Sequence, residues 1–228
     1  IKKRLIDEMI ARRFENIYVC SHDGLRLRAR LYMQNENAPF AIGMHGYRST
    51  PMLDFSGGGA LALKLGFNLL LPDQRACGES EGKSISFGYN ESLDVIDWVK
   101  YVNGKFGEDR PVVLLGVSLG AGTVIMAAGR GLPKNVKGVI ADCTFSSAKE
   151  IVTKVMHDKG IPAILYPLLR IGTIIYGGFD PNRAEPVEAV KHAVGDASVL
   201  GQKANGIRFI KIHRQVRNAS CHTFIHKL

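Results

Sequence analysis

Clustered cysteines and an apolar leader are both missing from this chain of 228 residues. Its four cysteines, Cys20, Cys77, Cys143 and Cys221, are far apart and show neither a CxxC pair nor metal-ligand spacing. A disulfide framework and a zinc site are therefore not expected, and the cysteines are interpreted as buried thiols in a reducing compartment. The first residues, Ile1-Lys2-Lys3-Arg4, lack the apolar segment of a signal peptide. We therefore expect a cytoplasmic location.

Long uninterrupted apolar segments are missing as well. The most lipophilic window, residues 160–179, has about the length of a membrane span, but it contains Pro162, Pro167 and Arg170. Prolines and a charged side chain are unfavourable in hydrocarbon. We expect packed or lid-forming helices there and no membrane span.

The composition is that of a folded globular protein, with 46% hydrophobic and 22% charged residues. At roughly 150 residues per domain, residues 1–228 are predicted to form a single domain. The net charge is +9, and residues 193–228 contribute six basic residues and one acidic residue, so more than half of the excess lies in this basic tail. Elsewhere the two signs are mixed, so nucleic acid is not an expected partner.

Strand-like and helix-like segments alternate along the chain, which predicts an α/β fold with a mostly parallel sheet and helices on both faces. An Asp-Gly turn joins two β-rich segments near the N-terminus and predicts an opening hairpin. The expected strands are residues 14–20, 25–32, 40–44, 67–71, 112–117 and 136–141, and the expected helices are residues 60–65, 91–102 and 119–128.

The strongest chemical signal is the pentapeptide Gly116-Val117-Ser118-Leu119-Gly120, which follows an apolar strand and opens a helix. A G-x-S-x-G sequence in this context is typical of a nucleophile elbow, in which a strained turn presents the serine to the active site. Glycines on either side allow the strand and the helix to approach closely. Ser118 is therefore the predicted nucleophile.

A second motif, His45-Gly46-Tyr47, ends the third strand, where an acyl-transfer enzyme needs donors for an oxyanion. The expected donors are the backbone N–H groups of Tyr47 and Leu119. The His45 side chain is expected to pack and form hydrogen bonds beneath the loop, so we do not assign it as the general base.

With these motifs, the sequence resembles the α/β-hydrolase superfamily, particularly its bacterial esterase-like and serine-aminopeptidase-like members. The resemblance covers residues 14 to about 190 and also includes the segment Asp73–Ser80 and the strand that ends in Asp142. It implies a serine nucleophile without metal or organic cofactor. It also implies that Asp73 and Arg75 are scaffold residues and that Asp142 anchors a loop, with the acid of the catalytic triad as the alternative role of Asp142. Recognition of an anionic substrate by Arg75 or Arg48 is the alternative.

The resemblance places a helical cap at about residues 146–190, a segment rich in Ile, Leu, Tyr and Pro. Such a cap favours a small-molecule ester or acyl substrate that is partly apolar. An ordinary helix pair that fills the core is the alternative. The sequence leaves the oligomeric state open.

The resemblance ends in the tail, residues 193–228, which lacks the expected His-Gly, the acid before Val-Pro and the later Gly-His. Either Asp196 and His222 are the acid and the base of a diverged catalytic triad, or the tail is foreign sequence such as a frameshift produces. We favour the second explanation, which leaves the C-terminal strands of the sheet missing or aberrant. The predicted function is serine hydrolysis of a carboxylic ester, with a catalytically impaired ligand-binding protein as the alternative.

Overall fold

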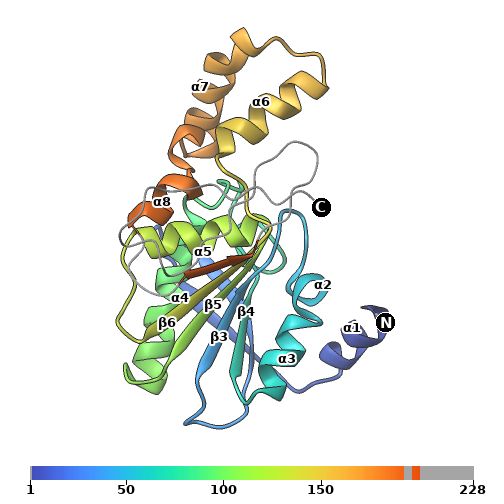
Figure 1. The fold of residues 1–228 in the computed structure, drawn as a ribbon, viewed down its shortest axis with the longest axis vertical. Helices are drawn as coiled ribbons and strands as arrows, with labels where there is room; N and C mark the ends of the chain where they lie inside the picture. Colours follow the sequence, from blue (N-terminus) through green and yellow to red (C-terminus); the bar gives the residue numbers. More distant parts are fainter. Residues whose placement is uncertain (1, 193–196, 201–228) are drawn as a thin grey trace.

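A computed structural model describes residues 2–192 and 197–200 of the chain (Figure 1). These residues form a seven-stranded sheet in the order β1-β2-β4-β3-β5-β6-β7. The strands are β1 (Glu15–Cys20), β2 (Arg26–Tyr32), β3 (Phe40–Met44), β4 (Asn68–Pro72), β5 (Val112–Val117), β6 (Val136–Asp142) and β7 (Ala197–Leu200). Strand β2 is antiparallel to β1 and β4, and the remaining pairs are parallel. The α/β-hydrolase fold predicted from the sequence is confirmed.

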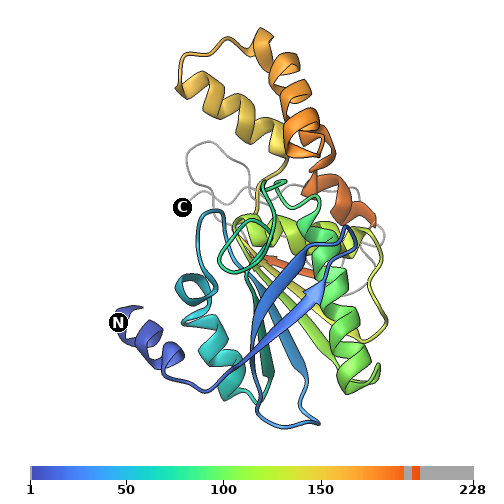
Figure 2. The ribbon, with the colours of Figure 1, turned by 180° about the vertical axis from the view of Figure 1, so that it is seen from behind.

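Helices cover both faces of this sheet (Figure 2). The helices are α1 (Lys2–Ile10), α2 (Pro51–Phe55), α3 (Gly58–Lys64), α4 (Glu91–Phe106), α5 (Leu119–Gly129), α6 (Ala148–Asp158), α7 (Tyr166–Gly177) and α8 (Pro186–His192), with short 3₁₀ helices η1 (Ala163–Leu165) and η2 (Pro181–Arg183). Successive strand residues point to opposite faces. Ile42 therefore packs with α4 and α5, whereas Ala41 packs with α1 to α3.

The predicted hairpin and the six predicted strands all form, and β3 and β5 have the predicted bounds. Helix α2 was not predicted, although the sequence carries its start signal. Thr50 caps α2 by accepting a hydrogen bond from the N–H of Leu53 at 3.3 Å, and Pro51 occupies the first helical turn, where it costs no hydrogen bond. This short helix brings its first-turn acid, Asp54, to the active site.

A helical arm, residues 146–183, stands beyond the carboxyl ends of the strands (Figure 1). It contains α6, η1, α7 and η2. The Ser84 hydroxyl donates to the Gly177 carbonyl at 2.8 Å, and the Phe87 and Phe179 rings lie 6.2 Å apart, so the arm is fixed to the body at its base. Helix α8, which also lies in the predicted cap region, packs instead on α5.

The structure also bears on two further expectations, the burial of the cysteines and the absence of a membrane span. The described cysteines are not buried, because Cys20 is exposed and Cys77 and Cys143 are partly exposed. The prediction of buried thiols is therefore wrong for these three, and Cys221 lies outside the described residues. No helix within residues 2–192 is long and apolar enough to cross a bilayer.

Candidate active site

Ser118 occupies the turn between β5 and α5, with φ +53° and ψ −111°. This backbone conformation is strained for a residue with a Cβ atom. The neighbouring glycines are sterically required, because a Cβ at Gly116 would lie 2.3 Å from the Gly120 carbonyl oxygen and a Cβ at Gly120 would lie 1.9 Å from the Met44 carbonyl oxygen. The Ser118 side chain is exposed. The local geometry is that of a nucleophile elbow.

The loop after β3 runs beside this elbow. A Cβ at Gly46 would lie 3.3 Å from both the Ser118 Cβ and Asp54 Oδ2. Asp54 accepts hydrogen bonds from the Gly46 N–H and the Ser49 hydroxyl, each at 2.7 Å. In the described part of the chain, neither the Tyr47 N–H nor the Leu119 N–H donates a hydrogen bond. The two N–H groups predicted to form an oxyanion hole therefore remain available for a ligand.

Asp54 is a residue that the sequence interpretation missed. Asp54 lies in the unpredicted helix α2, eight residues after Gly46, and accepts a hydrogen bond from the Gly46 N–H. The Thr50-Pro51 start signal could have revealed the helix, but its contact with the loop is a tertiary feature. Asp54 fixes the backbone next to Tyr47.

His45 is buried beneath the same loop and is not available as a base. Its Nδ1 lies 2.9 Å from the Gly46 carbonyl oxygen, and its Nε2 accepts the Gln74 N–H at 3.1 Å. This pair of contacts fixes the neutral tautomer with the proton on Nδ1. Burial also lowers the pKa of His45 below its usual value. The Gln74 side chain donates to the His45 carbonyl and accepts from Thr123 on α5, which ties the loop to the elbow helix.

Arg75 and Asp73 are structural, as the resemblance implied. The Arg75 guanidinium is buried and makes hydrogen bonds with Asp94 at 2.6 and 2.8 Å and with Asp23 at 2.8 and 3.2 Å. The hydrogen bond from Arg75 lowers the pKa of Asp23 to about 2. Asp73 pairs with Arg28 at 3.0 Å. Arg75 thus has two carboxylate partners already and is not free to bind an anionic substrate.

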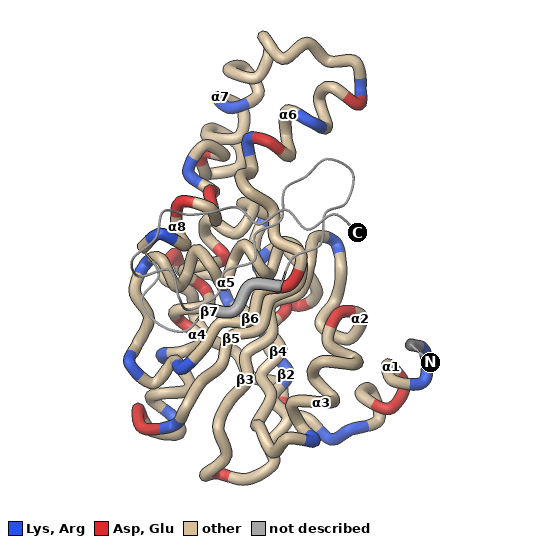
Figure 3. Tube along the Cα trace, viewed as in Figure 1, with Lys and Arg blue, Asp and Glu red and all other residues tan. Residues whose placement is uncertain are grey.

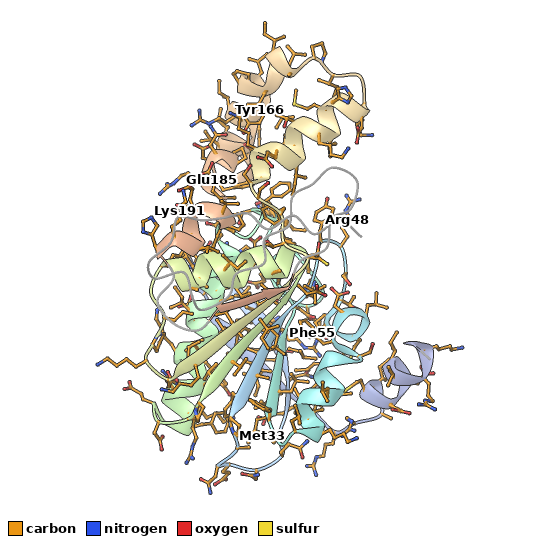
Figure 4. The ribbon with its side chains drawn as sticks, in the orientation of Figure 1. Met33, Arg48, Phe55, Tyr166, Glu185 and Lys191 are labelled. Carbon is orange, nitrogen blue, oxygen red and sulfur yellow. The ribbon has the colours of Figure 1, made fainter. Side chains whose placement is uncertain are left out.

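Arg48 differs from Arg75, because it is exposed on the loop next to Tyr47 (Figure 4). Its guanidinium carbon lies 5.3 Å from the centre of the Tyr47 ring, and its backbone has φ +52°. Of the two arginines considered for anion recognition, only Arg48 retains that possibility.

Asp142 ends β6 and supports the elbow through its backbone, since its carbonyl accepts the Ser118 N–H at 2.8 Å. The predicted acid and base, Asp196 and His222, lie outside the described residues. Ala197, which follows Asp196 in the sequence, pairs with Val139, three residues before the carboxyl end of β6. Within residues 2–192 and 197–200, the Ser118 hydroxyl has no hydrogen-bond partner.

One cluster among the described residues has the composition of a metal site. His22, Asp94 and Asp97 each bring a ligand atom within 4.8 Å of the others. However, both Asp94 oxygens accept hydrogen bonds from Arg75, and Asp97 accepts the His22 N–H at 2.8 Å. These carboxylates are thus used to hold the scaffold together.

Comparison with known proteins places this geometry in a family. A family model described as the alpha/beta hydrolase fold matches residues 52–199. The match ends within β7, so it extends into the segment predicted to be atypical.

Two curated proteins are similar to part of the chain. The uncharacterized protein YqkD of Bacillus subtilis is 29% identical over 134 residues, which are 57% of this chain and 43% of that protein. The thiohydrolase aneE of Aspergillus aculeatus is 30% identical over 151 residues, which are 65% of this chain and 45% of that protein. The chain spans less than half the length of either relative.

The esterase Pf2001 of Pyrococcus furiosus has a similar solved structure. It superimposes with a TM-score of 0.62 at 19% identity, over 84% of this chain and 72% of that one. This likeness concerns the fold. Together with the family match over residues 52–199, it leads to one conclusion: the chain belongs to the α/β-hydrolase fold family.

Proposed function

We propose that this chain hydrolyses a carboxylic ester through an acyl-enzyme on Ser118, with thioesters and amides as the nearest alternatives. The observation that carries the proposal is the exposed hydroxyl of Ser118 on a strained elbow, next to the unpaired N–H groups of Tyr47 and Leu119. A serine nucleophile and an oxyanion hole are the two parts of acyl transfer that a fold must hold rigidly.

The proposed reaction uses both parts in turn. A base accepts the Ser118 proton while Oγ attacks the substrate carbonyl carbon. The resulting oxyanion accepts hydrogen bonds from Tyr47 and Leu119, and loss of one such donor typically costs about 2.7–4 kcal/mol of transition-state stabilisation. Leu119 is the first residue of α5, so the positive end of the helix dipole also favours the oxyanion. The leaving group takes the proton from the base, and water then hydrolyses the acyl-enzyme.

The proposed acid and base of this reaction are Asp196 and His222. Asp196 and His222 occur in the chain order Ser, Asp, His that accompanies this kind of elbow. Without a base, Ser118 is a weak nucleophile, and catalysis falls to about 10³–10⁴-fold over water. The alternative function is therefore a catalytically impaired protein that still binds acyl ligands.

The substrate is proposed to be a small ester or acyl compound with an apolar part. The esterase and the thiohydrolase among the similar proteins support this class. A protein-bound metal or organic cofactor is not part of the proposed chemistry, because the serine mechanism needs neither.

A fluorophosphonate probe tests the proposal, because it phosphonylates an activated serine. We expect intact-mass spectrometry to show one adduct on the wild-type chain and none on Ser118→Ala, with equal far-UV circular dichroism for both. An adduct that persists in Ser118→Ala would refute the assignment of the nucleophile. If the wild-type chain gives no adduct but binds a fluorescent fatty acid saturably, the ligand-binding alternative is favoured instead.

A further inference from the structure

Helix α7 is oriented with its polar side toward the protein and its apolar side toward solvent. On the inner side, the partly exposed Arg170 guanidinium donates to Asp180 at 2.9 and 2.6 Å. The buried Tyr166, labelled in Figure 4, donates its hydroxyl to Asn182 at 2.5 Å. A surface helix of a globular protein normally has the opposite orientation. The outer side of α7 therefore needs a cover that the described residues do not supply.

Six of the exposed apolar residues form one continuous stripe, and Leu169 and Ile174, 36% and 44% exposed, lie beyond its two edges. Ile164, Leu168, Ile171 and Ile175 are 84%, 67%, 53% and 68% exposed, and they recur at intervals of four, three and four residues. At roughly 100° per residue, these four side chains and the flanking Leu165 and Tyr176 span an arc of about 140°. We call these six residues, of which Ile164 and Leu165 belong to the adjoining η1, the outer face of α7.

The outer face is too large to be an ordinary surface feature. Its six side chains expose on the order of 800 Å² of mostly apolar area, taking about 200 Å² for a fully exposed large residue. The largest apolar patch on a typical monomer is about 300–600 Å². Each partner in a standard protein interface buries about 800 Å². The outer face has the size of one side of such an interface.

Its chemistry favours another helix over a lipid surface. The intervals of four, three and four are those of a coiled-coil seam, and a Cβ built at Gly172 within this face meets no atom within 4 Å. Helices that lie on membranes combine an apolar face with many free Lys and Arg residues. Here Arg170 is the only charged residue of α7 and pairs with Asp180, while Lys154 on α6 pairs with Asp158 (Figure 3).

We propose that a second copy of this chain covers the outer face, with the two α7 helices packed antiparallel around a two-fold axis near Leu168 and Ile171. A two-fold axis places the same patch on both partners, so each apolar seam meets an identical seam. In the antiparallel arrangement the two helix dipoles point in opposite directions, so they attract each other and stabilise the contact. Because α7 has no unpaired charge, the net charge of +9 on each chain does not create repulsion at this contact.

The test is the mass of the full chain in solution, measured by light scattering after gel filtration. The wild type should elute at about 50 kDa, twice the 25.0 kDa of one chain. Leu168→Glu combined with Ile175→Glu should weaken the dimer at least about 100-fold, because truncating or charging central anchors removes most binding energy. Leu61→Glu is the matched control, since Leu61 is a 56% exposed leucine of α3 in the body, and this variant should stay dimeric.

Disulfide cross-linking between the two copies supplies a second measurement of the dimer, and it needs no substitution that weakens the contact. Ile171→Cys should form a disulfide-linked dimer on mild oxidation, because the axis brings the two copies of residue 171 together. The wild type, whose exposed Cys20 is retained, is the control for non-specific oxidation.

Three outcomes would overturn the proposal. One is a wild-type monomer at micromolar concentration, and another is a dimer that survives the Leu168→Glu and Ile175→Glu changes. The third is a monomer that co-sediments with phosphatidylcholine and phosphatidylserine vesicles and loses this binding in the double variant, which would assign the outer face to lipid. None of these readouts depends on hydrolase activity, so the proposal and the proposed function fail separately.

Discussion

Replacing Ser118 by glycine should stabilise the folded chain, even though it deletes the proposed nucleophile. Ser118 has φ +53° and ψ −111°, a conformation that glycine adopts freely and that other residues adopt at a cost. Ser118→Ala is the informative comparison, because alanine keeps the Cβ atom and hence the strain. The difference in the free energy of unfolding between the two variants therefore measures the cost of the backbone conformation at residue 118.

The expected magnitude follows from two opposing contributions. Relief of strain at such a site gives about 1–3 kcal/mol. The greater freedom of glycine in the unfolded chain costs about 0.5–1 kcal/mol. The glycine variant should therefore be more stable than the alanine variant by about 0.5–2 kcal/mol. Removal of the hydroxyl itself should matter little, because it is exposed and has no partner among the described residues.

Urea unfolding followed by fluorescence measures this difference directly. The chain has one tryptophan, Trp98, which is fully buried in the core and so reports global unfolding. Ala60→Gly in α3 is the control at an ordinary helical position, where glycine should cost about 1 kcal/mol relative to alanine. If Ser118→Gly were as stable as Ser118→Ala, or less stable, the strained elbow would not exist in solution.

Two further predictions follow from the elbow and the tail. Gly120→Ala should destabilise the chain by more than about 3 kcal/mol and abolish probe labelling of Ser118. The alanine Cβ would lie 1.9 Å from the Met44 carbonyl oxygen, so either β3 or α5 must move. A melting temperature within about 2 °C of the wild-type value would contradict this prediction. If residues 193–228 are foreign sequence, translation of another reading frame of the coding DNA in this region should recover a His-Gly, an acid before Val-Pro and a later Gly-His. If neither alternative frame contains them, the tail is native sequence and Asp196 and His222 become the acid and base to test.

Local sequence determined most of the sheet and the elbow. Each buried strand is a short apolar segment bounded by turn residues, α4 has one apolar face, and α5 is apolar throughout, so these patterns suffice to predict the alternation. The elbow was equally predictable, since Gly116 and Gly120 are required by contacts within a few residues of Ser118 and across to the end of β3. The predicted scaffold role of Arg75 is also found in the structure.

Features that depend on distant contacts could only be decided by the tertiary structure. Asp54 and Gln74 hold the loop around His45 from different elements, and nothing in the spacing of these residues reveals the hydrogen bonds that join them. The sequence likewise showed that α7 is apolar, but an apolar helix can face a core, a substrate or solvent. The ion pair of Arg170 with Asp180 fixes one side of α7 to the arm and leaves its apolar side outward, and the sequence pattern does not reveal this pairing between residues ten positions apart.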